Sequence, residues 1–283
     1  QSELDRSHSI VIVTGFQGIN KYGDVTTLGR GGSDTSAVAL AAALKADLCQ
    51  IYTDVDGVYT ADPRLVKNAR KLDEITYDEM LELSTLGAGV LHNRSVEMAK
   101  KYGVQLVVRS SLNTNEGTIV REEVNMEKML VSGVAVDKNA TRIAVVGLKD
   151  EPGVAFHLFN ALAKYNINVD VILQSIGRDG TKDISFTVAE DVADEAVAII
   201  QKSFPKSDYK KIDEEKDVAK LSIVGAGMMS NPGVAASMFE ALYDCGVNIK
   251  MISTSEIRVT VLIDQKYVER AINAVHDKFS LAD

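Results

Sequence analysis

One stretch of the chain occurs twice, and it decides the fold of the second half. RIAVVG at residues 142–147, followed by PGVA at residues 152–155, returns as KLSIVG at residues 220–225, followed by PGVA at residues 232–235. After each Pro-Gly pair the pattern predicts a helix, two apolar strands and a second helix, so each copy is a β-α-β-β-α unit. A ferredoxin-like sheet needs a fourth strand, which the repeated stretch itself does not contain.

Two short segments outside the repeated stretch are candidates for the missing strands. Residues 209–213 follow the second helix of the first copy and complete it. The second copy ends at Asp283, too soon after its helix for another strand, whereas residues 130–136 precede the first copy and have no place in it. We therefore predict that residues 130–136 pair with the second copy, so that one module is inserted into the other.

The first half shows the alternation of an α/β domain with a largely parallel sheet. The apolar, β-branched run at residues 9–13 predicts a buried strand that ends in a glycine turn, and the alanine-rich stretch 36–44 predicts a helix. Strand, glycine loop, helix and strand in this order are typical of α/β folds. The other predicted elements are strands over residues 48–52 and 106–108 and helices over residues 77–84 and 95–102.

The composition excludes several classes of function. The 283 residues, 46% hydrophobic and 25% charged, suit a globular protein of two or three domains. A net charge of −9 without a Lys/Arg-rich block argues against a nucleic-acid partner, and no apolar stretch has the length of a membrane span. The two cysteines fit no metal-spacing pattern and are typical of reduced thiols, so we expect a cytoplasmic protein without a dedicated metal site.

A glycine-rich loop, LGRGGSDTS at residues 28–36, precedes the alanine-rich helix. Glycine lets the backbone approach a ligand closely, and the first turn of a helix offers unpaired N–H groups to an anion. The alternative is that Ser33 or Asp34 caps the helix while the glycines form a turn. An arginine within the glycine run favours the functional interpretation. The loop is not a Walker motif, because no Gly-Lys-Ser/Thr follows.

A second polar segment, YTDVDGVYTADPR at residues 52–64, follows a predicted strand, at the end where open α/β sheets bind their ligands. It combines three carboxylates, two tyrosines and an arginine. Asp-Gly and Asp-Pro are also ordinary turn formers, so the residues by themselves support a ligand site and a solvated turn equally. The four histidines of the chain are too scattered to indicate a metal site.

These motifs together resemble the aspartate kinases. The similarity runs through VTGFQG at residues 13–18, TTLGRGGSD at 26–34, TDVDGVYTADPR at 53–64, VLH at 90–92, RSS at 109–111 and the repeated modules, which resemble the paired ACT domains of that family. The resemblance implies the C-terminal part of a three-layer αβα amino-acid kinase domain over residues 1–120. It further implies two ferredoxin-like βαββαβ ACT domains, the first over residues 141–214 and the second over residues 129–138 and 218–283.

The resemblance implies ATP-dependent phosphorylation of the side-chain carboxylate of L-aspartate, with magnesium entering together with ATP. A carboxylate is ionised at neutral pH and needs no general base, so catalysis consists of positioning and charge stabilisation. By the resemblance, Arg30 clamps a carboxylate of aspartate, and Asp34 faces its ammonium group or orients a catalytic lysine. The substrate pocket would further include Gly15, Phe16 and Ser33. The nucleotide site would be lined by Thr53, Asp54, Tyr59, Thr60, Ala61, Asp62, Pro63, Arg64 and Gly89, the last at a position where some members carry a lysine.

The resemblance also implies feedback control by lysine, threonine or both, and a homo-oligomer, which we expect to be a dimer formed through the ACT domains. The effector site would consist of Asp150, Pro152, Gly153, Val154, Ala155, Asn168, Asp170 and Gln174. The N–H groups of the first helical turn, near Val154 and Ala155, suit the α-carboxylate of an amino acid, and Asp150 and Asp170 suit its ammonium group. Alternatively, the Pro-Gly pair only initiates the helix.

One feature of the family is missing from the printed sequence. Members of the family open with a strand and a Lys-(Phe/Tyr)-Gly-Gly-(Thr/Ser) motif that positions the phosphates, so we expect little turnover from this chain by itself. Two hypotheses follow: an ACT-regulated kinase that lacks this segment, or a non-catalytic regulatory subunit or fragment that senses an amino acid. The Arg30 loop favours the kinase. The sensor is favoured by the absent motif and by Met126 or Met129, which stand where an internal start would fall.

Overall fold

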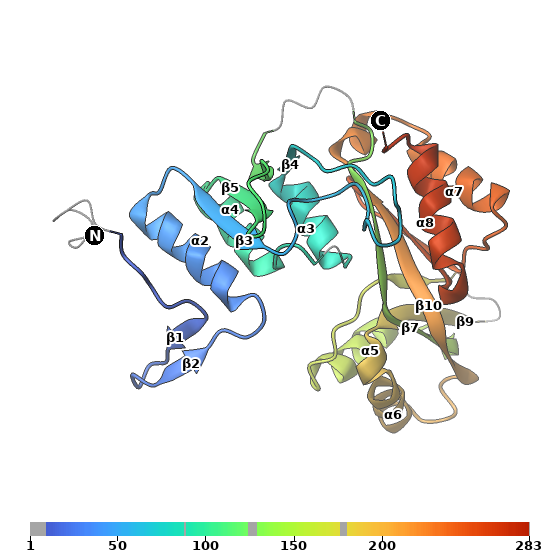
Figure 1. Ribbon diagram of the computed structural model, residues 1–283. Coiled ribbons are helices and arrows are strands. Elements are labelled where there is room, and N and C mark those ends of the chain that lie inside the picture. Colours follow the sequence, from blue (N-terminus) through green and yellow to red (C-terminus); the bar gives the residue numbers. More distant parts are fainter. Residues whose placement is uncertain (1–9, 88, 124–128, 176–179, 283) are drawn as a thin grey trace. The chain divides into compact units, whose positions relative to one another are not determined.

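The computed structural model describes residues 10–87, 89–123, 129–175 and 180–282, so the predictions for residue 9 and Met126 lie outside the described residues (Figure 1). The chain divides into two compact units. The first consists of residues 1–135, 223–234 and 276–283, and the second of residues 136–222 and 235–275.

The first unit contains a four-stranded mixed sheet in the order β3-β5-β6-β4. β3 (Cys49–Thr53) is parallel to β5 (Leu106–Ser110), β5 is antiparallel to β6 (Thr118–Arg121), and β6 is parallel to β4 (Glu74–Thr76). Buried residues alternate with more exposed ones along β3, β5 and β6, so one face of the sheet carries the core. The predicted strands at residues 48–52 and 106–108 are confirmed.

The helices α2 (Gly32–Leu44), α3 (Tyr77–Thr85) and α4 (Asn93–Tyr102) supply the other side of this core. α4 contacts both α2 and α3. Fully buried apolar side chains from each helix, such as Val38, Met80 and Val96, belong to the same cluster as the residues of β5 and β6. The three helices predicted from the sequence are confirmed, and the α/β class with them.

The strand predicted over residues 9–13 is wrong for its described part. Residues 10–13 form no strand, and Ile10 and Ile12 are 94% and 92% exposed. An apolar, β-branched run becomes a buried strand only where neighbouring elements cover it, and none of the described strands pairs with this run. The chain continues instead into a short antiparallel hairpin of β1 (Gln17–Ile19) and β2 (Val25–Thr27).

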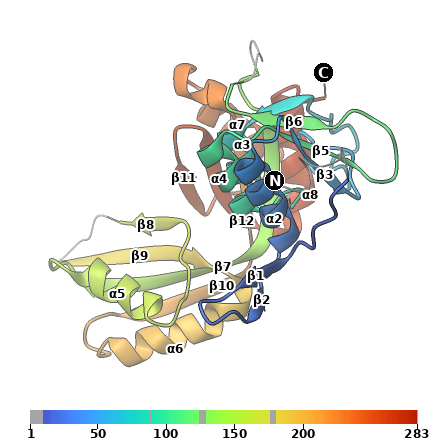
Figure 2. The same cartoon turned by 90° about the vertical axis from the view of Figure 1, so that its left-hand side faces the viewer.

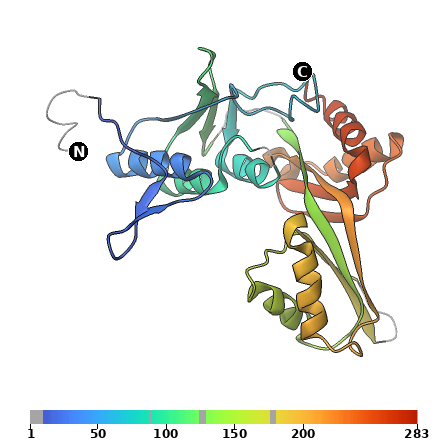
Figure 3. The ribbon, with the colours of Figure 1, turned by 60° about the horizontal axis from the view of Figure 1, so that its bottom comes forward.

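The repeated modules share one six-stranded sheet, in the order β11-β12-β10-β7-β9-β8. Its two long central strands, β7 (Gly133–Lys149) and β10 (Lys211–Val224), run side by side in Figures 1 and 3. Figure 2 shows β8 at the edge of the sheet, next to β9. The shorter strands are β8 (Ile172–Gln174), β9 (Thr181–Val188), β11 (Met251–Thr254) and β12 (Arg258–Asp264).

Each long strand belongs to both modules. The second half of β7 and the first half of β10 pair with each other, because the N–H of Lys210 donates to the carbonyl of Val146 at 2.8 Å. The other halves also pair, because the N–H of Ser132 donates to the carbonyl of Val224 at 2.7 Å. The prediction that residues 130–136 pair with the second copy, with one module inserted into the other, is therefore confirmed. Each pair of predicted strands has, however, merged into one continuous strand.

Two helices cover one face of each module. In the first module, α5 (Val154–Ala163) and α6 (Ala193–Ser203) lie on the same side of the sheet (Figure 3). They bury Leu158 and Ile200 in the same cluster as Phe186 of β9. In the second module, α7 (Val234–Asp244) and α8 (Val268–Lys278) bury Leu242 and Ile272. Short 3-10 helices precede α6, α7 and α8, at Glu190–Val192, Ala226–Ser230 and Gln265–Tyr267.

Candidate functional site

The glycine-rich loop wraps around the N-terminus of α2. Gly29 and Gly31 have φ angles of 75° and 72°, the left-handed conformation that glycine adopts without strain. A Cβ at Gly31 would lie 2.3 Å from the side chain of His92, so only glycine fits this position. No side-chain hydrogen bond caps α2, whose N-cap residue is Gly31. Capping by Ser33 or Asp34 is therefore not the role of the loop. The N–H of Gly32 donates to the carbonyl of Gly29 at 3.0 Å, and the next N–H groups of the first turn are of the kind that binds an anion.

Two residues at the start of α4 hold this loop in place. Nη2 of Arg94 donates to the carbonyls of Leu28 at 2.9 Å and Arg30 at 2.8 Å. The backbone N–H of His92 donates to the carboxylate of Asp34, while its Nδ1 accepts the N–H of Arg94 at 3.3 Å as the cap of α4. Neither residue has a role predicted from the sequence. One feature of the sequence pointed to this place: the VLH motif at residues 90–92, which ends at His92, two residues before Arg94.

The structure brings the predicted substrate residues together at the N-terminus of α2. A Cβ at Gly15 would touch Ser33, at 3.5 Å from its Cα. Phe16 has a positive φ of 67°, and its N–H donates to Oγ of Ser36 at 3.1 Å. Its carbonyl accepts the N–H of Leu28 at 2.9 Å. We call Gly15, Phe16, Arg30, Ser33 and Asp34 the glycine-loop cluster.

The glycine-loop cluster combines an exposed cation with a partly buried acid. The side chain of Arg30 is exposed, whereas Asp34 is half-buried. Burial raises the pKa of Asp34, and the hydrogen bond from the backbone of His92 and the charge of His92 oppose this rise. Burial, followed by the charge of Asp34, also raises the pKa of the Cys49 thiol. An amino acid fits such a cluster with its carboxylate on Arg30 and its ammonium group on Asp34.

The predicted nucleotide residues of the second motif follow the end of β3, and we call residues 53–64 the nucleotide segment. The hydroxyl of Thr53 donates to Oδ1 of Asp54 at 3.0 Å. Arg64 binds both carboxylate oxygens of Asp62, with Nη2 and Oδ2 2.7 Å apart. The side chain of Arg64 is 88% exposed, so this ion pair contributes little stability and a phosphate can compete for the guanidinium.

A hydrogen bond stiffens the turn within the nucleotide segment. The hydroxyl of Tyr59 donates to Oδ1 of Asp56 at 2.7 Å, and the amide of Asn115 donates to the other oxygen at 3.3 Å. The bond with Tyr59 is the main cause that lowers the pKa of Asp56, and the same bond raises the pKa of Tyr59. Asp56 therefore stays ionised and holds the ring of Tyr59, one of the predicted nucleotide contacts, in one position.

The remaining predicted nucleotide residues differ in exposure. Thr60 and Ala61 are 0% and 4% exposed, so their side chains support the segment from behind. Pro63 is exposed beside Arg64. Gly89 is exposed in the connection between α3 and α4, with a φ of 51°.

The predicted effector residues do not lie together within the first module. Residues 150–155 lie at the N-terminus of α5, where the N–H of Asp150 donates to the carbonyl of Gly180, whereas the N–H of Asp170 donates to the carbonyl of Thr187, near the other end of β9. The expectation that Asp150 and Asp170 face the same ammonium group is therefore wrong within one module. Gly153 is the N-cap of α5, with a φ of 94° and no side-chain hydrogen bond at the cap. Asp150 forms an ion pair with Lys182 at 2.7 Å. Asp170 forms one at 2.7 Å with Lys220, which also contacts Asp137 at 2.8 Å. Of the other predicted residues, Val154 and Ala155 are half-buried, and Pro152, Asn168 and Gln174 are exposed.

A cavity of about 620 Å³ lies beside the same helix terminus. Pro152 and Val154 line it together with Lys149, His157 and Phe204. It therefore includes two of the predicted effector residues but neither Asp150 nor Asp170.

The described part of the chain contains no helix that is long and apolar enough to cross a membrane. Within the same residues, no three His, Cys, Asp or Glu side chains are grouped so that they could hold a metal ion.

Comparisons with known proteins identify a kinase segment followed by ACT domains, in the order expected from the sequence. The model of the amino acid kinase family matches residues 2–110, and the model of the ACT domain matches residues 143–204 and 221–279. The aspartokinase of Helicobacter pylori (strain ATCC 700392 / 26695) is 52% identical over 285 residues, which cover 99% of this chain and 70% of the relative. The aspartokinase of Bacillus sp. (strain MGA3) is 53% identical over 283 residues, which cover 100% of this chain and 69% of the relative.

Solved structures of similar proteins give the same result. The aspartate kinase of Clostridium acetobutylicum matches with a TM-score of 0.82 at 30% identity, over 94% of this chain and 62% of that chain. Aspartokinase III of E. coli in complex with aspartate and ADP matches with a TM-score of 0.78 at 29% identity, over 93% of this chain and 59% of that one. The same enzyme in complex with lysine and aspartate gives 0.74 at 29% identity, over 94% and 59%. This chain thus spans less than two thirds of these solved structures.

Proposed function

The chain belongs to the aspartokinase family, and from this premise we propose that it binds L-aspartate and ATP for transfer of the γ-phosphoryl group to the aspartate side chain. The observation that carries the proposal is the glycine-loop cluster, which places the exposed Arg30 and the half-buried Asp34 at the N-terminus of α2. The complex of E. coli aspartokinase III with aspartate and ADP supports this choice of substrates.

The proposed reaction needs no proton transfer. A side-chain oxygen of aspartate, already ionised at neutral pH, attacks the γ-phosphorus, and the bond to the β,γ-bridging oxygen breaks. The products are 4-phospho-L-aspartate and ADP. Arg30 would hold a carboxylate of aspartate, with Asp34 facing the ammonium group and Gly15, Phe16 and Ser33 closing the pocket. Such a site accelerates the reaction by holding two anions in line and stabilising the charge of the transferred group.

We assign the ATP site to the nucleotide segment and Gly89. Arg64 would move from Asp62 to the phosphates, because its exposed ion pair is weak. Thr53, Asp54, Tyr59 and Pro63 would line the same site. Magnesium would enter bound to the phosphates of ATP, since it keeps several waters and prefers the oxygen ligands that carboxylates such as Asp54 provide.

The repeated modules are the proposed regulatory part of the chain. E. coli aspartokinase III has been solved in complex with lysine and aspartate. By analogy we propose that lysine, threonine or both bind the first ACT module at the residues around Asp150. We propose the same domain boundaries as before: the kinase domain over residues 1–120, the first ACT domain over 141–214 and the second over 129–138 and 218–283. A dimer formed through the ACT modules and a cytoplasmic location remain predictions.

Titration calorimetry on the 283-residue chain tests the proposed function. We expect separate binding heats for ADP and for L-aspartate. Arg30→Ala should weaken the binding of L-aspartate by about 2–5 kcal/mol, the cost of removing one partner of a desolvated charge pair. Lys21→Ala, an exposed cation of the β1–β2 hairpin outside the cluster, is the matched control and should change neither affinity.

Two outcomes would contradict this proposal. An unchanged affinity for L-aspartate in Arg30→Ala would remove this residue from the site. Heats with lysine or threonine, but none with ADP or L-aspartate, would identify the chain as an amino-acid sensor without a catalytic site.

A further inference from the structure

Thr60, in the middle of the nucleotide segment, is held by hydrogen bonds on every polar atom. Its N–H donates to the carbonyl of Arg70 at 2.8 Å, and its Oγ1 accepts the N–H of Arg70 at 3.0 Å. Its carbonyl accepts the N–H of Val134 at 2.7 Å. Its Oγ1 also forms a hydrogen bond with Nε2 of His276, at 2.9 Å. All these residues belong to the first unit.

Two of these contacts come from the second ACT module. Val134 lies at the start of β7, the strand that completes this module, and His276 lies in the last turn of α8. Residues 60 and 276 are 216 positions apart in the chain. The segment that would bind the nucleotide is thus fixed to the regulatory module through one residue.

The environment of His276 indicates that this residue does more than fill space. The imidazole is 0% exposed, and among the described atoms its Nδ1 has no hydrogen-bond partner. Burying a polar nitrogen without a partner costs free energy, so an apolar side chain would suit this position better if packing were its only role. Among the described residues the ring makes one hydrogen bond, to Thr60, and its Nδ1 lies 4.0 Å from Oδ1 of Asp277, beyond hydrogen-bond distance.

We propose that His276 is a positioning residue for the nucleotide site: its Nε2 fixes Thr60 and thereby the course of the chain from Tyr59 to Arg64. This inference rests on the assignment of the nucleotide segment made above. His276 itself touches no substrate. It sets the place of the backbone that carries Tyr59, Asp62 and Arg64.

Glu79 provides a control, because it holds two other residues of the same module within the first unit. This buried carboxylate of α3 accepts the hydroxyl of Ser132 at 2.6 Å and the N–H of Ala226 at 2.9 Å. Its other oxygen accepts the N–H and the hydroxyl of Thr76, at 3.2 and 2.8 Å. A change at Glu79 therefore loosens the contact of Ser132 and Ala226 with α3 and removes no hydrogen bond of the nucleotide segment itself.

The test compares three variants of the full chain. His276→Phe keeps an aromatic ring but removes the hydrogen bond, whereas His276→Gln can offer an amide to Thr60 near the position of Nε2. Glu79→Gln is the control. The affinities for ADP and L-aspartate are measured by titration calorimetry, and the backbone amide exchange of residues 58–66 is measured by mass spectrometry.

We expect His276→Phe to weaken ADP binding by about three- to tenfold, the range that the loss of one net hydrogen bond gives, with L-aspartate binding unchanged. Amide exchange over residues 58–66 should rise, and His276→Gln should restore most of both effects. Glu79→Gln should lower the melting temperature without separating the two affinities.

The outcomes separate this inference from the proposed function. If His276→Phe leaves ADP affinity and exchange unchanged, or weakens both ligands equally, His276 does not position the nucleotide segment. If the unmodified chain binds no ADP, the proposed nucleotide site fails, and exchange by itself then decides. A rise over residues 58–66 in His276→Phe, reversed in His276→Gln, supports the positioning role, and an unchanged exchange overturns it.

Discussion

Arg94 shows how one side chain shapes the proposed substrate site without being part of it. Its guanidinium joins the carbonyls of Leu28 and Arg30, on both sides of Gly29. A planar group with several N–H donors can bridge two carbonyls at once, whereas the ammonium group of a lysine is a compact point charge on a flexible stem. The direction in which Arg30 leaves the backbone depends on this bridge.

Arg94→Lys should therefore weaken the binding of L-aspartate by about threefold to thirtyfold, because one or two hydrogen bonds that orient the loop are lost. Titration calorimetry measures the effect. Lys101→Arg, at an exposed position near the other end of α4, is the control and should leave the affinity unchanged. An Arg94→Lys variant with the affinity of the unmodified chain would show that Gly29 and Gly31 fix the loop without help.

The candidate site could be predicted from the sequence as far as its motifs reach. The residues of the glycine-loop cluster belong to two short motifs, at residues 13–18 and 26–34, whose glycines indicate an unusual backbone conformation. Arg94 and His276 escaped because their partners lie 64 to 66 and 216 residues away, and no local pattern encodes a contact over such a separation. The roles of Asp150 and Asp170 as partners of Lys182 and Lys220 are non-local in the same sense.

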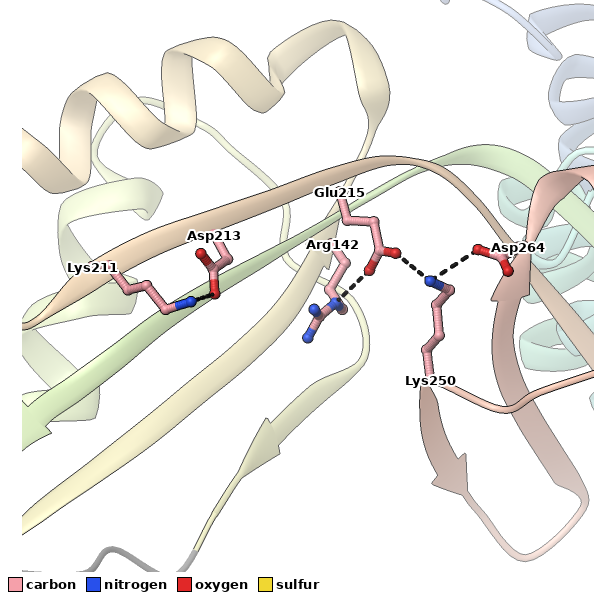
Figure 4. A network of polar contacts seen from close by, with 6 residues as sticks. All are labelled: Arg142, Lys211, Asp213, Glu215, Lys250 and Asp264. Atoms are coloured by element: carbon pink, nitrogen blue, oxygen red, sulfur yellow. Dashed lines mark hydrogen bonds and ion pairs between the residues drawn. The ribbon is translucent and has the colours of Figure 1, made fainter.

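At the scale of elements, charged residues join the two modules where β7 and β10 pass from one to the other. Glu215 of β10 accepts a hydrogen bond from Nε of Arg142 in β7 at 3.1 Å and also bonds to Lys250 (Figure 4). Lys250 in turn contacts Asp264 at the end of β12, at 2.9 Å. This network of ion pairs, from Arg142 to Asp264, thus connects the half of β7 that belongs to the first module with β12, the last strand of the second module.

Glu215→Ala should destabilise the fold by about 1–3 kcal/mol, because it leaves Arg142 without this acceptor and Lys250 with only one partner. Asp213, two residues earlier in β10, pairs with Lys211 at 2.7 Å with both side chains well exposed (Figure 4). Asp213→Asn is therefore the control and should cost less than about 0.5 kcal/mol. Urea unfolding at pH 7 measures both, and equal effects would show that the network around Glu215 adds nothing to an ordinary surface pair.

The same network predicts the direction of a pH effect. Burial would raise the pKa of Glu215, but the hydrogen bonds from Lys250 and Arg142, with their charges, outweigh burial and hold the pKa below its usual 4.5. The stabilisation is therefore complete above pH 4.5 and is lost as the pH falls through the lower value of the folded state. The stability of the unmodified chain and of Glu215→Gln should converge at acid pH.

The fold was predictable from the sequence where the local hydrophobic pattern matches the way in which neighbouring elements cover the segment. The repeat revealed two modules, and strand counting revealed that one is inserted into the other, because an incomplete sheet leaves an unpaired edge. The run at residues 10–13 shows the opposite case. Its residues have strand propensity, but burial depends on elements elsewhere, and a pattern does not reveal whether such elements are present.

At the scale of the whole molecule, a bound effector should stabilise the chain. A ligand that binds only the folded state at 100 times its dissociation constant adds about 2.7 kcal/mol. We expect lysine or threonine, but not glutamate, to raise the melting temperature in a thermal scan. Asp150→Asn should abolish most of the shift, because the carboxylate that now binds Lys182 would then no longer bind the ammonium group of the effector.

Asp194→Asn is the matched control for this experiment. Asp194 of α6 also pairs with a lysine, Lys216, at 2.7 Å, but it lies outside the proposed effector site. The shift should survive in this variant. A full shift retained in Asp150→Asn would place the effector elsewhere, and no shift with either amino acid would leave the two modules without a sensing role.

The continuous strands β7 and β10 have a consequence for how the chain is made. As the ribosome releases the polypeptide, the first half of β7 emerges before the second half of β10, its sheet partner in the second module, and β12 follows later. The first module can close its sheet once β10 has begun. The first half of β7 cannot complete its sheet pairing until the whole first module and the rest of β10 have been made, so this newborn edge is where a chaperone has the longest time to bind.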